Sequence, residues 1–137
     1  MEIRRELIKI DAKVIAPCTH EEECKLPKDD WCHSSCRIAR TKIHKQLKDG
    51  VVPYEDEKFS YMAFSKTPYK KAEIRVLRHP TIEPGKITLN ICTKDDIKKI
   101  IVTKKDKQSF KLARKIKCGD KCLYNEIDTG SYNHIPG

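Results

Sequence analysis

Long apolar runs are absent from this sequence. No stretch approaches the roughly 20 consecutive apolar residues that a helix needs to span a lipid bilayer. The first ten residues, MEIRRELIKI, lack the apolar centre of a secretory signal, and their acidic residues argue against a transit peptide. The sequence therefore predicts an intracellular protein with no membrane partner.

Glycine is also scarce, with 5 residues among 137. None of them builds the glycine-rich turn between a strand and a helix on which Rossmann-like domains bind their cofactors. His79 next to Pro80 is better explained as a structural residue than as a catalytic base. The adjacent acids Glu55, Asp56 and Glu57 cannot all face one site. The sequence therefore does not predict an enzyme that acts on its own.

The charge of the chain is basic and unevenly placed. There are 29 Lys and Arg against 20 Asp and Glu, which gives a formal net charge of +9 and favours a polyanionic partner, RNA or DNA. Residues Lys98–Lys117 contain nine basic side chains and one acid, Asp106, whereas Glu21–Asp30 is acidic. Hydrophobic residues make up 38% of the chain, so we expect a single domain with a modest core.

The seven cysteines indicate metal or redox chemistry, because an intracellular chain rarely relies on a disulfide framework. Cys18, Cys24 and Cys32 lie in a polar segment that shows no helical or strand pattern before about Ser34. An irregular loop of this length is uncommon unless something holds it. A metal centre would hold it, with Cys92, in the later pattern LNICT, as the fourth thiolate.

The spacing of these four cysteines leaves the metal open. Successive ligands are separated by 6, 8 and 60 positions, and the C-x-x-C pairs of many structural zinc sites are absent. Wide spacing fits an iron–sulfur cluster held by four thiolates, but zinc and plain reduced thiols are alternatives. His20 and His33 could complete a zinc site, donate hydrogen bonds to sulfur or have no role. We interpret Cys36 as a packing residue and Cys118 and Cys122 as spare thiols.

Hydrophobic periodicity predicts an α+β fold. After the irregular four-cysteine metal-binding loop, apolar residues at helical spacing predict a helix that starts at Ser34 or Ser35 and runs to about Lys48. Gly50 would end this helix. Its apolar stripe consists of Cys36, Ala39, Ile43 and Leu47.

The second half of the chain predicts a small, mostly antiparallel β-sheet and a basic C-terminal helix. Phe59–Phe64 is aromatic-rich and is expected to be a strand buried on both faces. Lys107–Lys117 is expected to be a helix with a basic outer face. The other expected elements are a helix at Met1–Lys9, strands at Ala12–Ala16, Glu73–Arg78, Lys86–Cys92 and Ile97–Thr103, and a turn at His79–Gly85. Residues 1–123 are expected to form a single domain, followed by an extended or disordered tail at Tyr124–Gly137.

Nine basic side chains are candidates for contacts with RNA phosphates, which position a protein without reading sequence. Tyr69 lies beside two of them and could stack on a base. The nine are Arg37, Arg40, Lys70, Lys71, Lys104, Lys105, Lys111, Arg114 and Lys115.

Six sequence blocks occur together in a recognisable order. They read APCTHEEECKLP from Ala16, DWCH from Asp30, YEDEKFSY from Tyr54, RVLRHP from Arg75, LNICT from Leu89 and ARKIKCGD from Ala113. Between Val14 and Asp120 the chain resembles the C-terminal part of the methyltransferase-like protein seventeen family. That family acts in assembly of the small ribosomal subunit in mitochondria and has bacterial relatives.

The resemblance implies a cofactor and a set of partners. In that family four cysteines of these blocks hold a [4Fe–4S] cluster, and the matching positions here are Cys18, Cys24, Cys32 and Cys92. The resemblance therefore favours a cluster over zinc. It also implies association with small-subunit ribosomal RNA and ribosomal proteins, in the mitochondrial matrix or a prokaryotic cytoplasm.

Family members also carry an N-terminal Rossmann-like domain that binds S-adenosylmethionine, whereas about 15 residues precede Ala16 here. We therefore expect a non-catalytic iron–sulfur RNA-binding module, either a ribosomal component or an assembly factor. One alternative is half of a split S-adenosylmethionine-dependent rRNA methyltransferase that works with a separate methyltransferase chain. Others are a zinc-binding version of the same module and a redox or iron sensor.

Overall fold

The computed structural model of the chain describes residues 2–47, 53–122, 126–127 and 132–134. These residues form an α+β fold, as predicted. The helices are α1 (Glu2–Lys9), α2 (Lys42–Leu47) and α3 (Lys107–Ala113). The strands are β1 (Lys13–Ala16), β2 (Ser34–Ala39), β3 (Tyr54–Phe59), β4 (Ala63–Ser65), β5 (Ile74–Val76), β6 (Thr81–Glu83), β7 (Lys86–Thr93), β8 (Ile97–Thr103), β9 (Lys121–Cys122) and β10 (Tyr132–His134).

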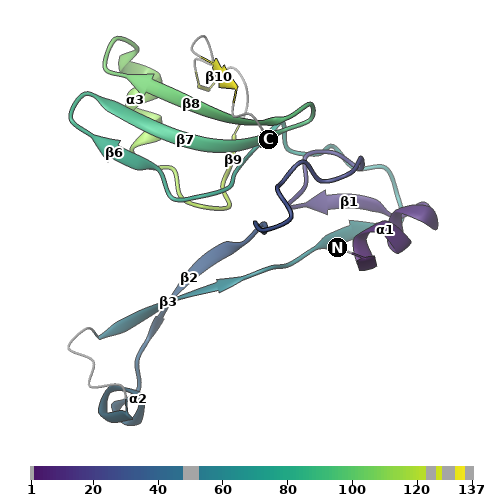
Figure 1. Cartoon of the computed structure of the whole chain (residues 1–137), viewed down its shortest axis with the longest axis horizontal. Coiled ribbons are helices and arrows are strands. Elements are labelled where there is room, and N and C mark those ends of the chain that lie inside the picture. Colours follow the sequence, from purple (N-terminus) through teal and green to yellow (C-terminus); the bar gives the residue numbers. More distant parts are fainter. Residues whose placement is uncertain (1, 48–52, 123–125, 128–131, 135–137) are drawn as a thin grey trace.

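Strand β7 lies at the centre of the largest sheet (Figure 1). The strand order is β10–β8–β7–β5–β9, all pairs are antiparallel, and β6 pairs with the start of β7. Ile87, Leu89 and Ile91 are fully buried and alternate with less buried neighbours along β7. This alternation confirms the predicted strand with one apolar face.

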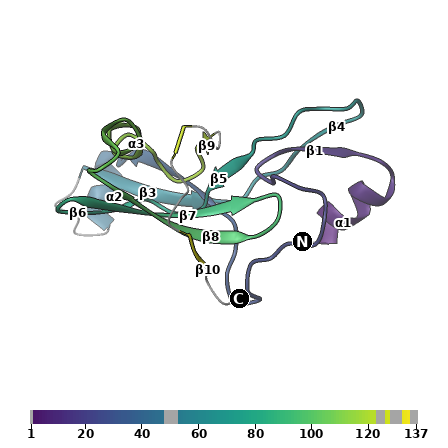
Figure 2. The same ribbon diagram turned by 90° about the horizontal axis from the view of Figure 1, so that it is seen from above.

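Helix α3 packs against the apolar face of this sheet, over β7 and β8 (Figure 2). Ala113 and the following Ile116 are buried in the core cluster. The Asp106 carboxylate caps the helix, because it accepts hydrogen bonds from the backbone N–H groups of Gln108 and Ser109, both at 3.1 Å. The predicted basic helix is thus present, although it ends at Ala113 rather than at the end of the predicted range.

The opposite face of the sheet carries the cysteine loop at one end. Lys121, Arg75 and Cys92 lie directly opposite one another across β9, β5 and β7, and paired residues project to the same face. Ile74 and Val76, on either side of Arg75, are buried in the core on the other face. Lys121, Arg75 and Cys92 therefore share the face opposite the core. Arg75 and Cys92 line a pocket together with cysteines of the loop of residues 17–33, which contains no helix or strand.

Strands β2 and β3 form a two-stranded ribbon that extends away from the large sheet toward α2 (Figure 1). The predicted helix from Ser34 or Ser35 to Lys48 is therefore wrong over its first half, and Lys48 lies outside the described residues. β2 pairs residue for residue with β3, and this cross-strand pairing outweighs the weak helical stripe. Cys36 and Ala39, two members of the predicted stripe, are consequently exposed on the ribbon instead of packed in a core.

The predicted strand Phe59–Phe64 is also wrong. β3 ends at Phe59, whose side chain is 43% exposed, and β4 begins at Ala63 and pairs with β1 instead of β2. The segment resembled one buried strand because the sequence does not show that its two ends pair with different strands. The predicted turn His79–Gly85 contains the strand β6, which forms a hairpin with β7 at Gly85, where φ is +80°.

Part of the C-terminal tail packs on the large sheet. Ile127 is fully buried in the core cluster, and β10 pairs with β8. The rest of the predicted tail Tyr124–Gly137, apart from Glu126, lies outside the described residues. None of the helices in the described residues combines the length and the apolar composition that a membrane crossing requires.

Candidate metal centre and basic surfaces

Four cysteines line one pocket with a volume of about 300 Å³. Cys18, Cys24 and Cys32 come from the loop of residues 17–33, and Cys92 comes from the end of β7. These are the four predicted ligands, and the fold brings them to the same cavity. Apolar side chains form much of its wall, namely Pro17, Leu26, Trp31, Tyr61, Met62, Leu77 and Ile97.

Hydrogen bonds to backbone carbonyls hold the cysteine loop against the sheet. Arg75 donates from Nε to the carbonyl oxygen of Pro17 at 2.9 Å and from Nη1 to that of Gly119 at 3.1 Å. The Ser60 hydroxyl donates to the carbonyl oxygen of Cys32 at 2.7 Å. The backbone next to Cys18 and at Cys32 is therefore positioned by side chains outside the loop.

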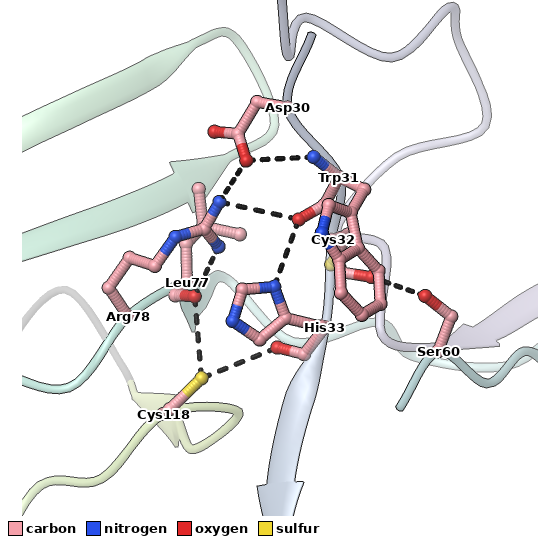
Figure 3. Close-up of polar contacts among 8 residues, drawn as sticks. All are labelled: Asp30, Trp31, Cys32, His33, Ser60, Leu77, Arg78 and Cys118. Carbon is pink, nitrogen blue, oxygen red and sulfur yellow. Dashed lines mark hydrogen bonds and ion pairs between the residues drawn. The ribbon is translucent and has the colours of Figure 1, made fainter. Parts of the chain in front are cut away.

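Arg78 and Cys118 fix the far end of the loop (Figure 3). The Arg78 guanidinium pairs with the Asp30 carboxylate. The Cys118 thiol lies 3.3 Å from the carbonyl oxygens of both His33 and Leu77, to which it can donate its proton. Burial raises the pKa of Cys118, which keeps that proton in place. Cys118 therefore joins the loop to the sheet as a thiol.

The other two cysteines outside the pocket have different surroundings. Cys36 is exposed on β2, so the interpretation of this residue as core packing is wrong. Cys122 is buried in the core cluster, and burial raises its pKa to about 11. Neither residue lines the cysteine pocket.

Burial also disfavours charged thiolates inside the pocket. The pKa of Cys32 is raised to about 11 by burial and then by its neighbours Cys18, Cys92 and Cys24. Burial raises the pKa of Cys92 as well, while the contact of its sulfur with Thr19 Oγ1, at 3.5 Å, acts in the opposite direction. Thiolates at these positions require added positive charge, which a bound metal centre supplies.

Two buried nitrogen atoms of pocket-lining residues lack hydrogen-bond partners in the described structure. Arg4 and His20 are 6% and 7% exposed, and the unpartnered atoms are Arg4 Nε and His20 Nδ1. Arg4 donates from Nη2 to the His20 carbonyl oxygen at 2.9 Å, and its charge meets no carboxylate among the described residues. Burial and then the nearby Arg4 lower the pKa of His20. Since the unpaired buried N–H of Arg4 is costly, this pocket suits an anionic occupant that accepts hydrogen bonds.

The arrangement of the side chains in the pocket can be compared with the coordination that a single metal ion requires. Among the residues that the structure describes, no group of three or more His, Cys, Asp or Glu side chains has the geometry to hold one. Zinc would need four donors converging at about 2.0–2.3 Å from one point. A cube of four irons takes one thiolate at each iron, so its ligands lie farther apart and surround a cavity. Four thiols around one cavity are the set of donors that such a cluster takes.

Three of the nine predicted RNA contacts are occupied by carboxylates. A phosphate would have to displace the carboxylate in each case, which makes these side chains weaker candidates. Arg37 also stacks over the Tyr54 ring, 3.8 Å from its centroid. The three ion pairs are Arg37 with Asp56 at 2.8 Å, Arg40 with Glu55 at 3.7 Å and Lys71 with Glu21 at 2.9 Å.

The other six predicted contacts are exposed and meet no carboxylate within the described part of the chain. Lys70 lies in the segment before β5. The remaining five gather on α3 and on the turns next to it, and we call them the α3 basic group. They are Lys104, Lys105, Lys111, Arg114 and Lys115.

Sequence reasoning missed Arg4, Arg75 and Lys121. Arg4 carries a signal in the sequence, because it shares the inner face of α1 with Leu7 and Ile8 at helical spacing. Arg75 and Lys121 become neighbours through the pairing of β5 with β9. A two-residue strand such as β9 has no pattern that sequence alone could reveal.

The fold and the site define a small basic α+β domain with a pocket of four cysteines. The family described as mitochondrial small ribosomal subunit Rsm22 matches residues 1–123, and the chain belongs to this family. The predicted resemblance to a small-subunit family is thereby confirmed, and membership associates the chain with the small ribosomal subunit. No curated protein matches the sequence.

Proposed function

We propose that this chain is a non-catalytic iron–sulfur protein that binds RNA of the small ribosomal subunit. The observation that carries the proposal is the pocket in which Cys18, Cys24, Cys32 and Cys92 meet beside two buried, unpartnered nitrogen atoms. Four thiols in an apolar pocket are the donor set of a [4Fe–4S] cluster. The family match supplies the ribosomal context.

The cluster has a structural role in this proposal. Bound in the pocket, it supplies a rigid crosslink of four bonds between the loop and β7. Arg4 and His20 line the pocket and would be the hydrogen-bond donors to a bound cluster, while Arg75 holds the loop backbone through the carbonyl oxygen of Pro17. The loop of residues 17–33 thus gains the support that its irregular backbone requires.

The α3 basic group is the proposed contact with ribosomal RNA. Ala113 and Ile116 anchor α3 and its C-terminal turn to the core, so the cations lie on a fixed surface. Lys111, Arg114 and Lys115 are exposed on its outer side. Such a surface suits docking along a phosphate backbone. Ribosomal proteins next to that RNA are the expected protein neighbours, and the family name makes the mitochondrial matrix the proposed location.

Metal analysis of protein purified without oxygen tests the cluster. We expect a brown protein with about four irons and four acid-labile sulfides per chain. Cys24→Ser or Cys32→Ser should lose iron, whereas the matched change Cys36→Ser should retain it because Cys36 is exposed on the ribbon. One zinc per chain without sulfide contradicts the cluster and leaves the zinc-binding version of the module.

Sedimentation of cell extract tests the partner. The protein should move with small-subunit fractions at low salt, and it should dissociate as salt rises. If about five phosphates are engaged, the log–log slope of affinity against salt should be roughly −4. Glutamate at Lys111, Arg114 and Lys115 together should weaken association while iron content stays unchanged. Absence from every small-subunit fraction, with iron bound, contradicts the ribosomal assignment and favours a redox sensor.

A further inference from the structure

We propose that a second pocket, on the far side of Arg75 from the cysteines, binds one nucleotide of single-stranded RNA. This inference rests on the proposed function, because it identifies where an unpaired base and its phosphate bind. The pocket has a volume of about 530 Å³, within the range of about 300–1,000 Å³ that small-ligand sites occupy. Its wall combines the segment Tyr69–Ala72 with the end of β1, the middle residue of β5 (Arg75), strand β9 and Glu126.

Cations dominate this pocket. Lys70 and Lys121 are exposed, and neither meets a carboxylate among the residues that the structure describes. Arg75 is only 8% exposed, and it donates from Nε and Nη1 to backbone carbonyls, so its charge is not neutralised by these partners. Lys71 is paired with Glu21, and Glu126 is the one acid of the lining. Two exposed lysines and a buried guanidinium therefore surround a site for one phosphate.

Tyr69 supplies a surface for a base at the edge of the same pocket. Its side chain is 52% exposed, and its ring contacts no other aromatic ring in the described structure. Exposed aromatic rings beside cations are the platform on which unpaired bases stack. Bases inside an RNA helix keep their faces covered by neighbouring bases, so the pocket requires a loop, bulge or single strand.

The position of this pocket separates it from the α3 basic group. Lys121 and Arg75 belong to the β9 edge of the sheet, whereas α3 packs over β7 and β8 on the opposite face. A change of charge at α3 alters the overall attraction to RNA but leaves this pocket intact. Two pairs of exposed lysines, one on each surface, can thus be compared in one protein.

Fluorescence anisotropy with a labelled RNA of roughly ten nucleotides tests the site, because that length covers a typical single-strand footprint. The iron-loaded full chain should bind the single strand more tightly than the same RNA in a duplex. Tyr69→Ala should weaken single-strand binding by about tenfold, and Tyr69→Phe should preserve it. Lys70→Glu with Lys121→Glu should reduce single-strand affinity more than the matched pair Lys104→Glu with Lys111→Glu.

Three outcomes overturn the site. Unchanged affinity in Tyr69→Ala removes the stacking role, and equal losses in the two charge-reversal pairs show general attraction only. Competition by adenosine monophosphate at the affinity of the RNA itself shows a site for free nucleotides. If these occur in a protein that still sediments with the small subunit, the pocket assignment alone fails. If the wild-type chain neither binds RNA nor sediments with the subunit, the proposed function fails as well.

Discussion

Arg4 occupies a position that helical spacing assigns to the inner face of α1, next to Leu7 and Ile8. Only 6% of its surface is exposed, and its Nε has no partner within the described structure. A buried cation without a carboxylate is unfavourable in isolation. Its placement becomes reasonable when an anionic group occupies the cysteine pocket that it lines.

Replacing Arg4 with methionine tests this explanation. Arg4→Met keeps the length of the side chain and removes its charge and donors, so a bound cluster should be harder to reduce and easier to lose. We expect a more negative reduction potential and faster bleaching in air, followed by absorption spectroscopy. Arg5→Met is the matched control, because Arg5 is exposed on the same helix. Equal behaviour of the two variants contradicts a role for Arg4 at the pocket.

The cysteines show which residues of the candidate site could be predicted from the sequence alone. Cys18, Cys24, Cys32 and Cys92 were predictable as a set because an irregular, cysteine-rich loop needs a crosslink. The unpartnered Arg4 was not predictable as their neighbour, because its place depends on how α1 packs against the loop. A side chain that acts through a contact between distant segments leaves little trace in its own sequence neighbourhood.

At the scale of elements, Asp106 controls the start of α3. Its carboxylate accepts hydrogen bonds from the side chain and backbone of Ser109 and from the backbone of Gln108. These bonds lower the pKa of Asp106 below its ordinary value of 3.8. The pKa is lower in the folded state, so the stabilisation is present above pH 3.8 and is lost as pH falls through the folded pKa.

Substitution at this cap should therefore depend on pH. Asp106→Ala should lower the melting temperature by a few degrees at pH 7, and the difference from wild type should shrink in acid below pH 3.8. Asp106→Asn should retain much of the stability at pH 7, because asparagine also caps helices. Circular dichroism melts at several pH values measure both effects. A difference that grows in acid would contradict the assigned role.

The ribbon of β2 and β3 explains the largest error of the sequence-based prediction. Cys36 and Ala39 look apolar and helical in spacing, yet both are exposed in a strand. The pattern was misleading because β2 gains its structure from pairing with β3 and not from burial. In contrast, β7 was predictable because its apolar face is fully buried.

A two-stranded ribbon without a core should also be less protected than the large sheet. Backbone amides of β2 and β3 should exchange with deuterium orders of magnitude faster than those of β7 and β8 in the isolated protein. Hydrogen-exchange mass spectrometry on peptic fragments provides the measurement, and β5 serves as an internal reference for the core. Similar protection of ribbon and sheet would show that the ribbon is stabilised by contacts beyond its own ladder.

At the scale of the whole molecule, the large sheet and the cysteine loop are stabilised by different interactions. The large sheet and α3 share a hydrophobic core, which includes Ile74, Leu89 and Ile100. The loop of residues 17–33 has no such core and is held by hydrogen bonds from Arg75, Ser60 and their neighbours. If the proposed cluster occupies the pocket, its loss should therefore loosen the loop before it affects the sheet.

Removal of iron gives the corresponding prediction. In chelated, iron-free protein, trypsin should cleave after the exposed Lys25 and Lys28 of the loop much faster than in the iron-loaded form. Cleavage at Lys98 and Lys99 in β8 should change little, because the core holds that strand. Timed digestion with mass spectrometry distinguishes the two regions. Identical digestion of both forms at the loop would mean that iron does not order it.

The separation of Cys92 from the other pocket cysteines has a consequence for biosynthesis. Cys18, Cys24 and Cys32 leave the translating ribosome first, and the strand that carries Cys92 follows 60 positions later. The pocket is incomplete until that strand has emerged and paired with β5, which fixes Arg75 opposite Cys92. During this interval three reduced thiols remain exposed on a nascent loop. A factor that protects these three thiols must therefore act while the loop is nascent, whereas any step that needs all four thiols must wait until Cys92 has emerged.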